Sequence, residues 1–259
     1  MTDKREYRKR QFLRSVKTVA EYLDVVNRQL DGSPSCLFRG HRRADWPLLP
    51  SAARDSFISR REESNMLAEF IRRSLPHTTS SGLLSRTDWL AIAQHHGMPT
   101  RLLDWTGSAL TALWFAVEKA AEGRRPAAVW VLPYTVDDFL DDEEKAPFGL
   151  HETVLVKPRH VTPRITAQDG WFTLHRSGRT DASAGPFLSL DNNKGYRERL
   201  KYVTVPATAF GQIRFELATA GITAAVIYPD LGGVAQYVTW AHKHLGDEIN
   251  YRLGSREPL

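Results

Sequence analysis

The chain has 259 residues, 42% of them hydrophobic, which is enough to bury the core of one large domain. Cys36 is its only cysteine, so an internal disulfide framework is excluded, and no apolar run approaches the roughly 20 residues that span a bilayer. Because the N-terminus is polar and charged and lacks the pattern of a secretory signal, we expect a cytoplasmic protein without membrane contact.

The formal net charge is +5, and much of the basic excess lies in residues 1–18. We predict that this segment is a basic arm or helix and that residues 19–259 form a single domain. Such a segment is typical of a solvated terminus, but it can also bind nucleic acid by releasing counterions. No zinc-finger or RNP motif accompanies it, so a solvated arm and a nucleic-acid contact are both left open.

Residue patterns near the start of the predicted domain favour two helices with a strand between them. Apolar residues at helical spacing predict an amphipathic helix at Val19–Leu30, and the same pattern recurs at Glu62–Ser74. Between them, Leu37 and Phe38 are typical of the end of a buried strand, with Arg39 where the strand opens into a loop. An arginine there suits a phosphate or carboxylate, because its planar fork of donors binds such groups with two hydrogen bonds.

Residues 94–106 gather two histidines, an arginine, an aspartate, a tryptophan and a threonine between two apolar helical patterns. Packing alone does not account for this concentration, and loops held by a rigid scaffold often carry binding or catalysis. In the alternative interpretation, Arg101 and Asp104 form a buried ion pair, and His95 or His96 caps the preceding helix. Arg39 in turn could pair with Asp104 or another internal acid rather than with a ligand.

The backbone of this run is also predictable. Gly97 can adopt a positive φ that ends the first helix, and Pro99 prevents helical continuation. We expect a short strand at Thr100–Asp104 and then a helix with Thr106 or Ser108 as its N-cap. A strand that leads directly into the N-terminus of a helix is a ready anion site.

The rest of the chain alternates strands and helices without an obvious βαβ period, which predicts an α+β fold with a mixed central sheet and flanking helices. We expect strands at Ala127–Pro133, Lys201–Pro206 and Ala224–Tyr228, helices at Thr208–Ala220 and Leu231–His244, a solvated acidic loop or short helix at Asp137–Lys145, and an exposed excursion or lid at Arg176–Asn193.

Nine histidines raise the question of a metal site. No histidine or cysteine pair has zinc-finger spacing, and no His-Glu-x-x-His helix occurs, so we predict no metal. A serine hydrolase is likewise unsupported, because the chain has no Gly-x-Ser-x-Gly elbow.

Several motifs, in order, resemble the FRG domain family, which is named for its Phe-Arg-Gly motif. The resemblance extends from about Val19 to His244. It is carried by Phe38-Arg39-Gly40, Trp-Pro-Leu-Leu-Pro at 46–50, Gln-His-His-Gly-Met-Pro-Thr-Arg-Leu-Leu-Asp-Trp-Thr at 94–106, Ala112–Glu118, Arg164–Phe172, Gly221-Ile222 and Tyr228–Leu231.

A weaker resemblance links the chain to the ADP-ribosyltransferase superfamily. Arg39 and the segment Asp104–Thr106 before a helix at Ser108–Ala121 are similar to its first two elements. The resemblance implies a split sheet in which Arg39 contacts the phosphate or ribose side of NAD and Thr106 shapes the nicotinamide pocket. The late motif has Gln168 where a glutamate is expected, and glutamine can bond a ribose hydroxyl but cannot act as a base.

The two resemblances imply an NAD-consuming ADP-ribosyltransferase or NAD glycohydrolase, acting as a bacterial toxin or phage-defence effector on an unknown acceptor. The alternative is a noncatalytic module that binds a nucleotide or nucleic acid. NAD is expected as a substrate rather than a resident cofactor. The expected catalytic residues are Arg39, Thr106 and Gln168, and the expected NAD-binding residues are Arg39, Gly40, His41, His95, Arg101, Asp104 and Trp105.

Overall fold

A computed structural model describes residues 8–30, 35–54, 60–77, 84–140, 147–159, 163–176, 187–243 and 245–248. Its strands are β1 (Phe12–Ser15), β2 (Cys36–His41), β3 (Leu102–Thr106), β4 (Ala127–Pro133), β5 (Val154–Val156), β6 (Gly170–Leu174) and β7 (Lys201–Val205). Its helices are α2 (Val19–Leu30), α3 (Arg60–Ser74), α4 (Arg86–His95), α5 (Ala109–Val117), α6 (Pro163–Ala167), α7 (Phe210–Thr219), α8 (Ala224–Ile227) and α9 (Leu231–His242).

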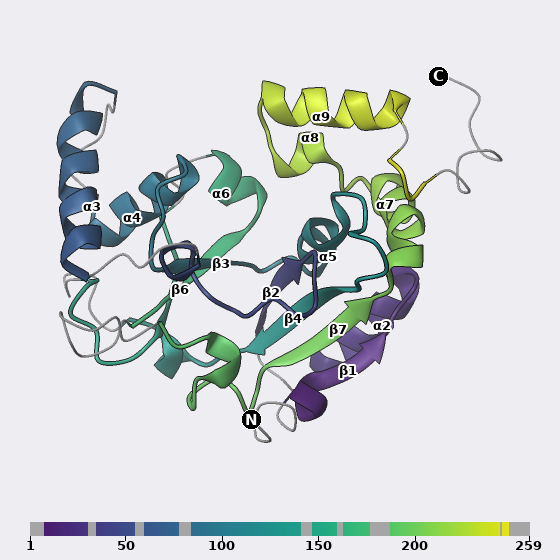
Figure 1. Ribbon diagram of the computed structural model, residues 1–259, viewed down its shortest axis with the longest axis horizontal. Coiled ribbons are helices and arrows are strands. Elements are labelled where there is room, and N and C mark those ends of the chain that lie inside the picture. The colour runs from purple at the N-terminus through teal and green to yellow at the C-terminus, as the bar shows by residue number, and fades with distance from the viewer. Residues whose placement is uncertain are drawn as a thin grey trace.

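These strands form one mixed sheet in the order β1-β7-β4-β2-β3-β6-β5 (Figure 1). β1 runs parallel to β7, and the other neighbours are antiparallel. Helices α5 and α7 lie beside the β2-β4-β7 part of the sheet, and α3, α4 and α6 lie beside β3 and β6 (Figure 1). The predicted α+β class, with a mixed central sheet and flanking helices, is therefore confirmed.

The sheet is nearly divided between β2 and β3. β2 pairs with β4 along its whole length from Cys36 to His41, and β3 pairs with β6 along its whole length. Between β2 and β3, however, the register holds a single pair, Phe38 with Thr106. Beyond that pair the two strands separate, so backbone groups at the opening need other partners.

Helix α5 packs closely on β2, and Gly40 makes this possible. A Cβ at residue 40 would lie 2.1 Å from the carbonyl oxygen of Ala112 and 2.6 Å from the amide nitrogen of Ala116. No side chain fits in that space, so glycine is required for the helix to approach the strand. The chain between β3 and α5 turns at Ser108, whose hydroxyl caps the helix by accepting a hydrogen bond from the Thr111 amide at 3.2 Å.

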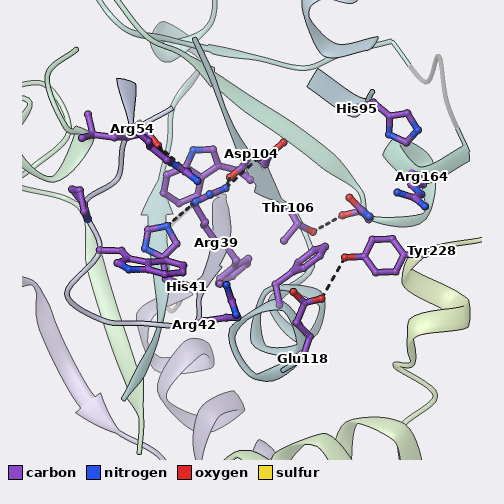
Figure 2. A pocket seen from close by; sticks show the side chains of 18 of the residues that line it. Arg39, His41, Arg42, Arg54, His95, Asp104, Thr106, Glu118, Arg164 and Tyr228 are labelled. Atoms are coloured by element: carbon purple, nitrogen blue, oxygen red, sulfur yellow. Dashed lines mark hydrogen bonds and ion pairs between the residues drawn. The ribbon is translucent and has the colours of Figure 1, made fainter. Parts of the chain in front are cut away.

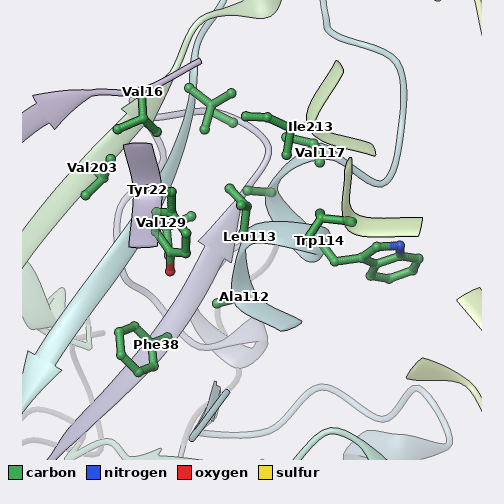
Figure 3. Packing of buried hydrophobic residues seen from close by; sticks show 14 of the residues in the cluster. Val16, Tyr22, Phe38, Ala112, Leu113, Trp114, Val117, Val129, Val203 and Ile213 are labelled. Carbon is green, nitrogen blue, oxygen red and sulfur yellow. The ribbon is translucent and has the colours of Figure 1, made fainter. Parts of the chain in front are cut away.

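The largest apolar cluster lies between this part of the sheet and its helices (Figure 3). Alternate residues of the strands face it, because successive side chains of a strand point to opposite sides. Figure 3 shows Phe38, Val129 and Val203 from the sheet meeting Leu113 of α5 and Ile213 of α7. This packing fixes α5, and therefore the end of β3, against the sheet.

Most predicted elements are present. Val19–Leu30 is a helix with the predicted bounds, and the strand at Ala127–Pro133 and the helix before Gly97, which has a φ of 89°, are confirmed. The expected strand at Thr100–Asp104 lies two residues later in the chain, because the backbone amide and hydroxyl of Thr100 bond the side chains of Ser51 and Gln94.

One predicted strand is wrong. Ala224–Tyr228 forms a short helix, α8 at Ala224–Ile227, rather than a strand. An apolar run of this length does not distinguish a strand from a buried helical turn. The helix is favoured because Gly233 of α9 packs directly on it, where a Cβ would lie 1.9 Å from the Tyr228 carbonyl oxygen.

Several expectations extend beyond the described residues. Residues 1–7 of the predicted arm, 141–145 of the acidic stretch, 177–186 of the predicted excursion and His244 lie outside them. Within the segment 1–18, Phe12–Ser15 is strand β1 of the sheet. Among the described residues, no helix has both the length and the apolar character that crossing a membrane requires.

The alternative pairing of Arg101 with Asp104 is wrong. Arg101 is 1% exposed and binds Glu63 of α3, with Nη2 2.6 Å and Nε 2.9 Å from Oε2. Its backbone amide donates to the other oxygen of Glu63 at 2.9 Å, and its guanidinium stacks on Phe148. Asp104 instead has an exposed side chain. The buried pair therefore fastens α3 to the start of β3.

We predict that Arg101→Ala lowers the free energy of unfolding by about 3–5 kcal/mol, because it leaves the Glu63 carboxylate buried without its cation. Asp104→Ala should change it by less than about 1 kcal/mol, since exposed ion pairs contribute little. Urea denaturation of both variants measures the difference. Equal destabilisation by the two substitutions would contradict this assignment of the buried pair.

Candidate functional site

A cavity of about 820 Å³ lies where β2 and β3 separate (Figure 2). We call it the cleft. It brings together the predicted site residues Arg39, Gly40, His41, His95, Asp104, Trp105, Thr106 and Gln168, which come from four separate segments of the chain. Arg101 does not line it, because its side chain is enclosed with Glu63.

Arg39 spans the opening between the two strands. Its Nη1 donates to the carbonyl oxygen of Asp104 at 2.5 Å and lies 3.5 Å from that residue's carboxylate. The guanidinium therefore supplies a hydrogen bond at an edge of β3 that β2 does not reach. The expected alternative, a pair with Asp104, is thus present, but the Asp104 side chain is 60% exposed. Burial lowers the pKa of Arg39 to about 10, so it remains a cation at neutral pH.

His41 also contacts the guanidinium group of Arg39 and orients it. The Nε of Arg39 donates to Nε2 of His41 at 3.0 Å, and the ring is 4% exposed. Burial, with Arg39, Arg54 and Arg8 nearby, holds the pKa of His41 well below its usual range. The neutral ring therefore accepts on Nε2 and carries its proton on Nδ1. With its lone pair engaged by an arginine, His41 positions that arginine rather than acting as a base.

Thr106 and Gln168, two of the predicted catalytic residues, are engaged in the wall of the cleft. The Thr106 hydroxyl donates to the Gln168 carbonyl oxygen at 2.5 Å and accepts from the Ser108 amide at 3.0 Å. The Gln168 side chain donates to the Ile227 carbonyl oxygen at 3.2 Å. These bonds tie the end of β3 to α6 and α8, so both residues shape the cleft.

Sequence reasoning did not identify Glu118, the carboxylate on the opposite side of the cleft from Arg39 (Figure 2). It follows the last residue of α5, and the Tyr228 hydroxyl donates to its Oε2 at 3.4 Å. Burial raises the pKa of Glu118, although Lys119, Arg42 and the tyrosine hydroxyl act in the opposite direction. Glu118 stood at the end of a recognised motif, but only the rotation of α5 decides that it faces the cleft.

Three further arginines, Arg42, Arg54 and Arg164, line the cleft. Arg42 lies 3.7 Å from Glu122, and Arg164 binds Asp230 at 2.6 Å. Arg54 donates twice to the Leu49 carbonyl oxygen, at 3.0 and 2.9 Å, and has no carboxylate partner among the residues that the structure describes.

Charge and aromatic surface thus combine in the cleft. Four arginines face two carboxylates, so the site attracts anions. His95 adds little charge, because burial, His96 and Arg164 lower its pKa. Rings of Trp46, Phe115 and Tyr228 lie among the charges. The combination suits a ligand with phosphate groups and planar rings.

The fold and cleft define an α+β protein with a basic cavity at a nearly divided sheet. Residues 34–125 match the family model of the FRG domain. The matched span includes Arg39, Asp104, Thr106 and Glu118, whereas the late motif with Gln168 lies beyond it. Comparisons with curated proteins and with solved structures gave no match.

We predict that Glu118→Gln raises the melting temperature at pH 7. The raised pKa means that the folded protein favours the protonated carboxyl, so this contribution to stability is present at low pH and is lost as pH rises through the folded-state pKa. The neutral amide removes the penalty at pH 7, and the gain should shrink as pH falls through the folded-state pKa and vanish below about 4.3, the ordinary value for glutamate.

Differential scanning calorimetry across pH measures this effect. Glu122→Gln is the matched control, because Glu122 lies at the surface beside Arg42 and Arg43, at 3.7 and 3.6 Å, and should give no gain. A lower melting temperature for Glu118→Gln at pH 7 would show that the charged form of Glu118 is a structural partner.

Proposed function

We propose that the cleft binds NAD and breaks the bond between its ribose and nicotinamide, as an ADP-ribosyltransferase or an NAD glycohydrolase does. The observation that carries this proposal is the placement of a partly buried carboxylate, Glu118, in a cleft that is also lined by four arginines and several aromatic rings. The cavity, about 820 Å³, falls within the range of about 300–1,000 Å³ found for small-molecule sites.

Arg39 and Arg54 are the residues that we assign to the pyrophosphate. Each guanidinium group already donates to a fixed carbonyl oxygen, so each side chain is held before a ligand arrives. Asp104 competes for Arg39 only from an exposed position at 3.5 Å, so a doubly charged anion can replace it at small cost. The aromatic side chains Trp46, Phe115 and Tyr228 offer faces or edges to the planar rings of the ligand.

We assign to Glu118 the chemical role that the resemblance to the ADP-ribosyltransferase superfamily implies for the position of Gln168. When the ribose C1′–nitrogen bond breaks, the electron pair leaves with the pyridinium nitrogen, and nicotinamide departs as a neutral molecule. Positive charge then develops on the ribose, where a carboxylate stabilises it in a site that is partly shielded from water. The same carboxylate can accept the proton of the attacking water or acceptor, a transfer that a raised pKa favours.

The second candidate function is a noncatalytic nucleotide-binding module. It is favoured by one observation: Thr106 and Gln168, which the resemblance made catalytic, use their side chains to hold the wall of the cleft. In that case the arginines would bind the same class of ligand, and Glu118 would take no part in bond cleavage.

Incubation of the purified protein with NAD should release nicotinamide above background, because water replaces a missing acceptor. Glu118→Gln should lower the rate by about 10²–10⁴, the usual contribution of a positioned acid or base. The variant should still bind NAD and therefore still show a ligand-dependent rise in melting temperature. Glu122→Gln is again the control and should keep the wild-type rate.

The outcome distinguishes the two candidate functions. A rise in melting temperature with NAD but no released nicotinamide would support the binding module. If millimolar NAD neither raises the melting temperature nor releases nicotinamide, the cleft neither binds nor cleaves NAD, and both candidate functions are rejected for this ligand.

Arg39→Lys should weaken NAD binding by about 1.5–3 kcal/mol, because an ammonium group cannot reproduce the planar, two-donor contact with phosphate. In dissociation constants this is about ten- to 150-fold, measurable by isothermal titration calorimetry. Arg164→Lys is a suitable comparison, since Arg164 is already engaged by Asp230 at 2.6 Å and should change affinity less. A loss for Arg164→Lys as large as that for Arg39→Lys would contradict the assignment of the pyrophosphate to Arg39.

A further inference from the structure

A second cavity, of about 580 Å³, adjoins the cleft. Glu118 and Tyr228 line both cavities, so the hydrogen-bonded pair that they form is the partition between them. Figure 2 shows this pair at the border of the cleft, with the Tyr228 hydroxyl directed at the Glu118 carboxylate. A molecule in the second cavity would therefore approach Glu118 from the side opposite to a ligand in the cleft.

Side chains at the end of helix α5 continue this partition. Trp114 and Glu118 are four residues apart and share one face of the helix end, and Trp114 lines the second cavity. Phe115, one residue further along, lines the cleft instead. The Tyr228 ring contacts both aromatic side chains edge-on, with centroids 5.6 Å from Trp114 and 6.3 Å from Phe115.

The second cavity has a different chemistry from the cleft. Tyr237 and Trp240, on one side of α9, line it with ring centroids 6.3 Å apart and planes tilted by 33°. The Trp240 indole is held by a hydrogen bond from its Nε1 to Glu248 at 2.9 Å. Lys119 and Lys243 also line the cavity, and both are exposed. Lys119 in addition interacts electrostatically with Glu118.

We propose that the second cavity binds a base of single-stranded nucleic acid, which is the acceptor of the ADP-ribose group; this inference rests on the proposed function. Aromatic rings stack on any base, and lysines at the rim neutralise backbone phosphates. A protein acceptor would present one flexible side chain, which does not require a cavity of about 580 Å³ with Trp114, Tyr237 and Trp240 in its walls.

The transfer balances without a further reactant. The ribose C1′–nitrogen bond of NAD breaks, and nicotinamide leaves as a neutral molecule with the electron pair. A nitrogen or oxygen atom of the base forms the new bond to C1′, and its proton passes to Glu118. The position of Glu118 between the two cavities places one carboxylate beside both reacting partners.

Fluorescence anisotropy with a short fluorescein-labelled single-stranded oligonucleotide of mixed sequence tests the binding site. Tyr237→Ala should weaken binding by about tenfold or more, and Tyr237→Phe, which keeps the ring, should weaken it much less. The double variant Lys119→Ala/Lys243→Ala should lose more affinity than Lys157→Ala/Lys194→Ala, which removes the same charge from exposed positions outside the second cavity. Unchanged binding by Tyr237→Ala, or equal losses in the two lysine pairs, would overturn the proposal.

The acceptor is tested with wild-type protein, NAD and the same oligonucleotide, analysed by mass spectrometry. The expected product is an oligonucleotide heavier by one ADP-ribose group. Nicotinamide release without such a product, or label found on protein instead, would overturn this inference and leave the proposed function standing. Oligonucleotide binding that depends on Tyr237, without any nicotinamide release, would support the base site while rejecting the chemistry of the cleft.

Discussion

The near division of the sheet between β2 and β3 is the constraint on which the rest of the site depends. One register pair, Phe38 with Thr106, keeps the two halves in a single sheet, and the strands separate beyond it. A full ladder would have satisfied the backbone and closed the space. Instead, Arg39 donates to the Asp104 carbonyl oxygen at the opening, so the same side chain stabilises the separated edge and presents positive charge to the cleft.

The structure separates charges that hold the fold from charges that face the cleft. Arg101 and Glu63 are enclosed and satisfy each other through three hydrogen bonds, so removal of either leaves a buried charge. Arg39 and Asp104 lie within strands β2 and β3 of the same sheet, yet the Asp104 side chain is 60% exposed. A ligand can therefore exchange with Asp104 at Arg39, whereas no ligand can compete inside the Arg101 pair.

Features that depend on local patterns and motifs could be predicted from the sequence. Helical periodicity located Val19–Leu30, and the Phe-Arg-Gly and 94–106 motifs supplied the residues of the cleft on β2 and β3. Features set by long-range packing could not be predicted. The partner of Arg101 is 38 residues away on α3, the helical state of Ala224–Ile227 depends on Gly233 of α9, and Glu118 faces the cleft only because Gly40 fixes how α5 sits on β2.

The position of Glu118 then links the fold to its proposed chemistry. The close approach of α5 to β2 at Gly40 carries the end of that helix to the border of the cleft, where Tyr228 meets Glu118. Burial there raises the pKa of the carboxyl, which is unfavourable for stability at neutral pH. A carboxyl at this position, between a basic cavity and an aromatic one, is the feature on which the proposed reaction between two ligands rests.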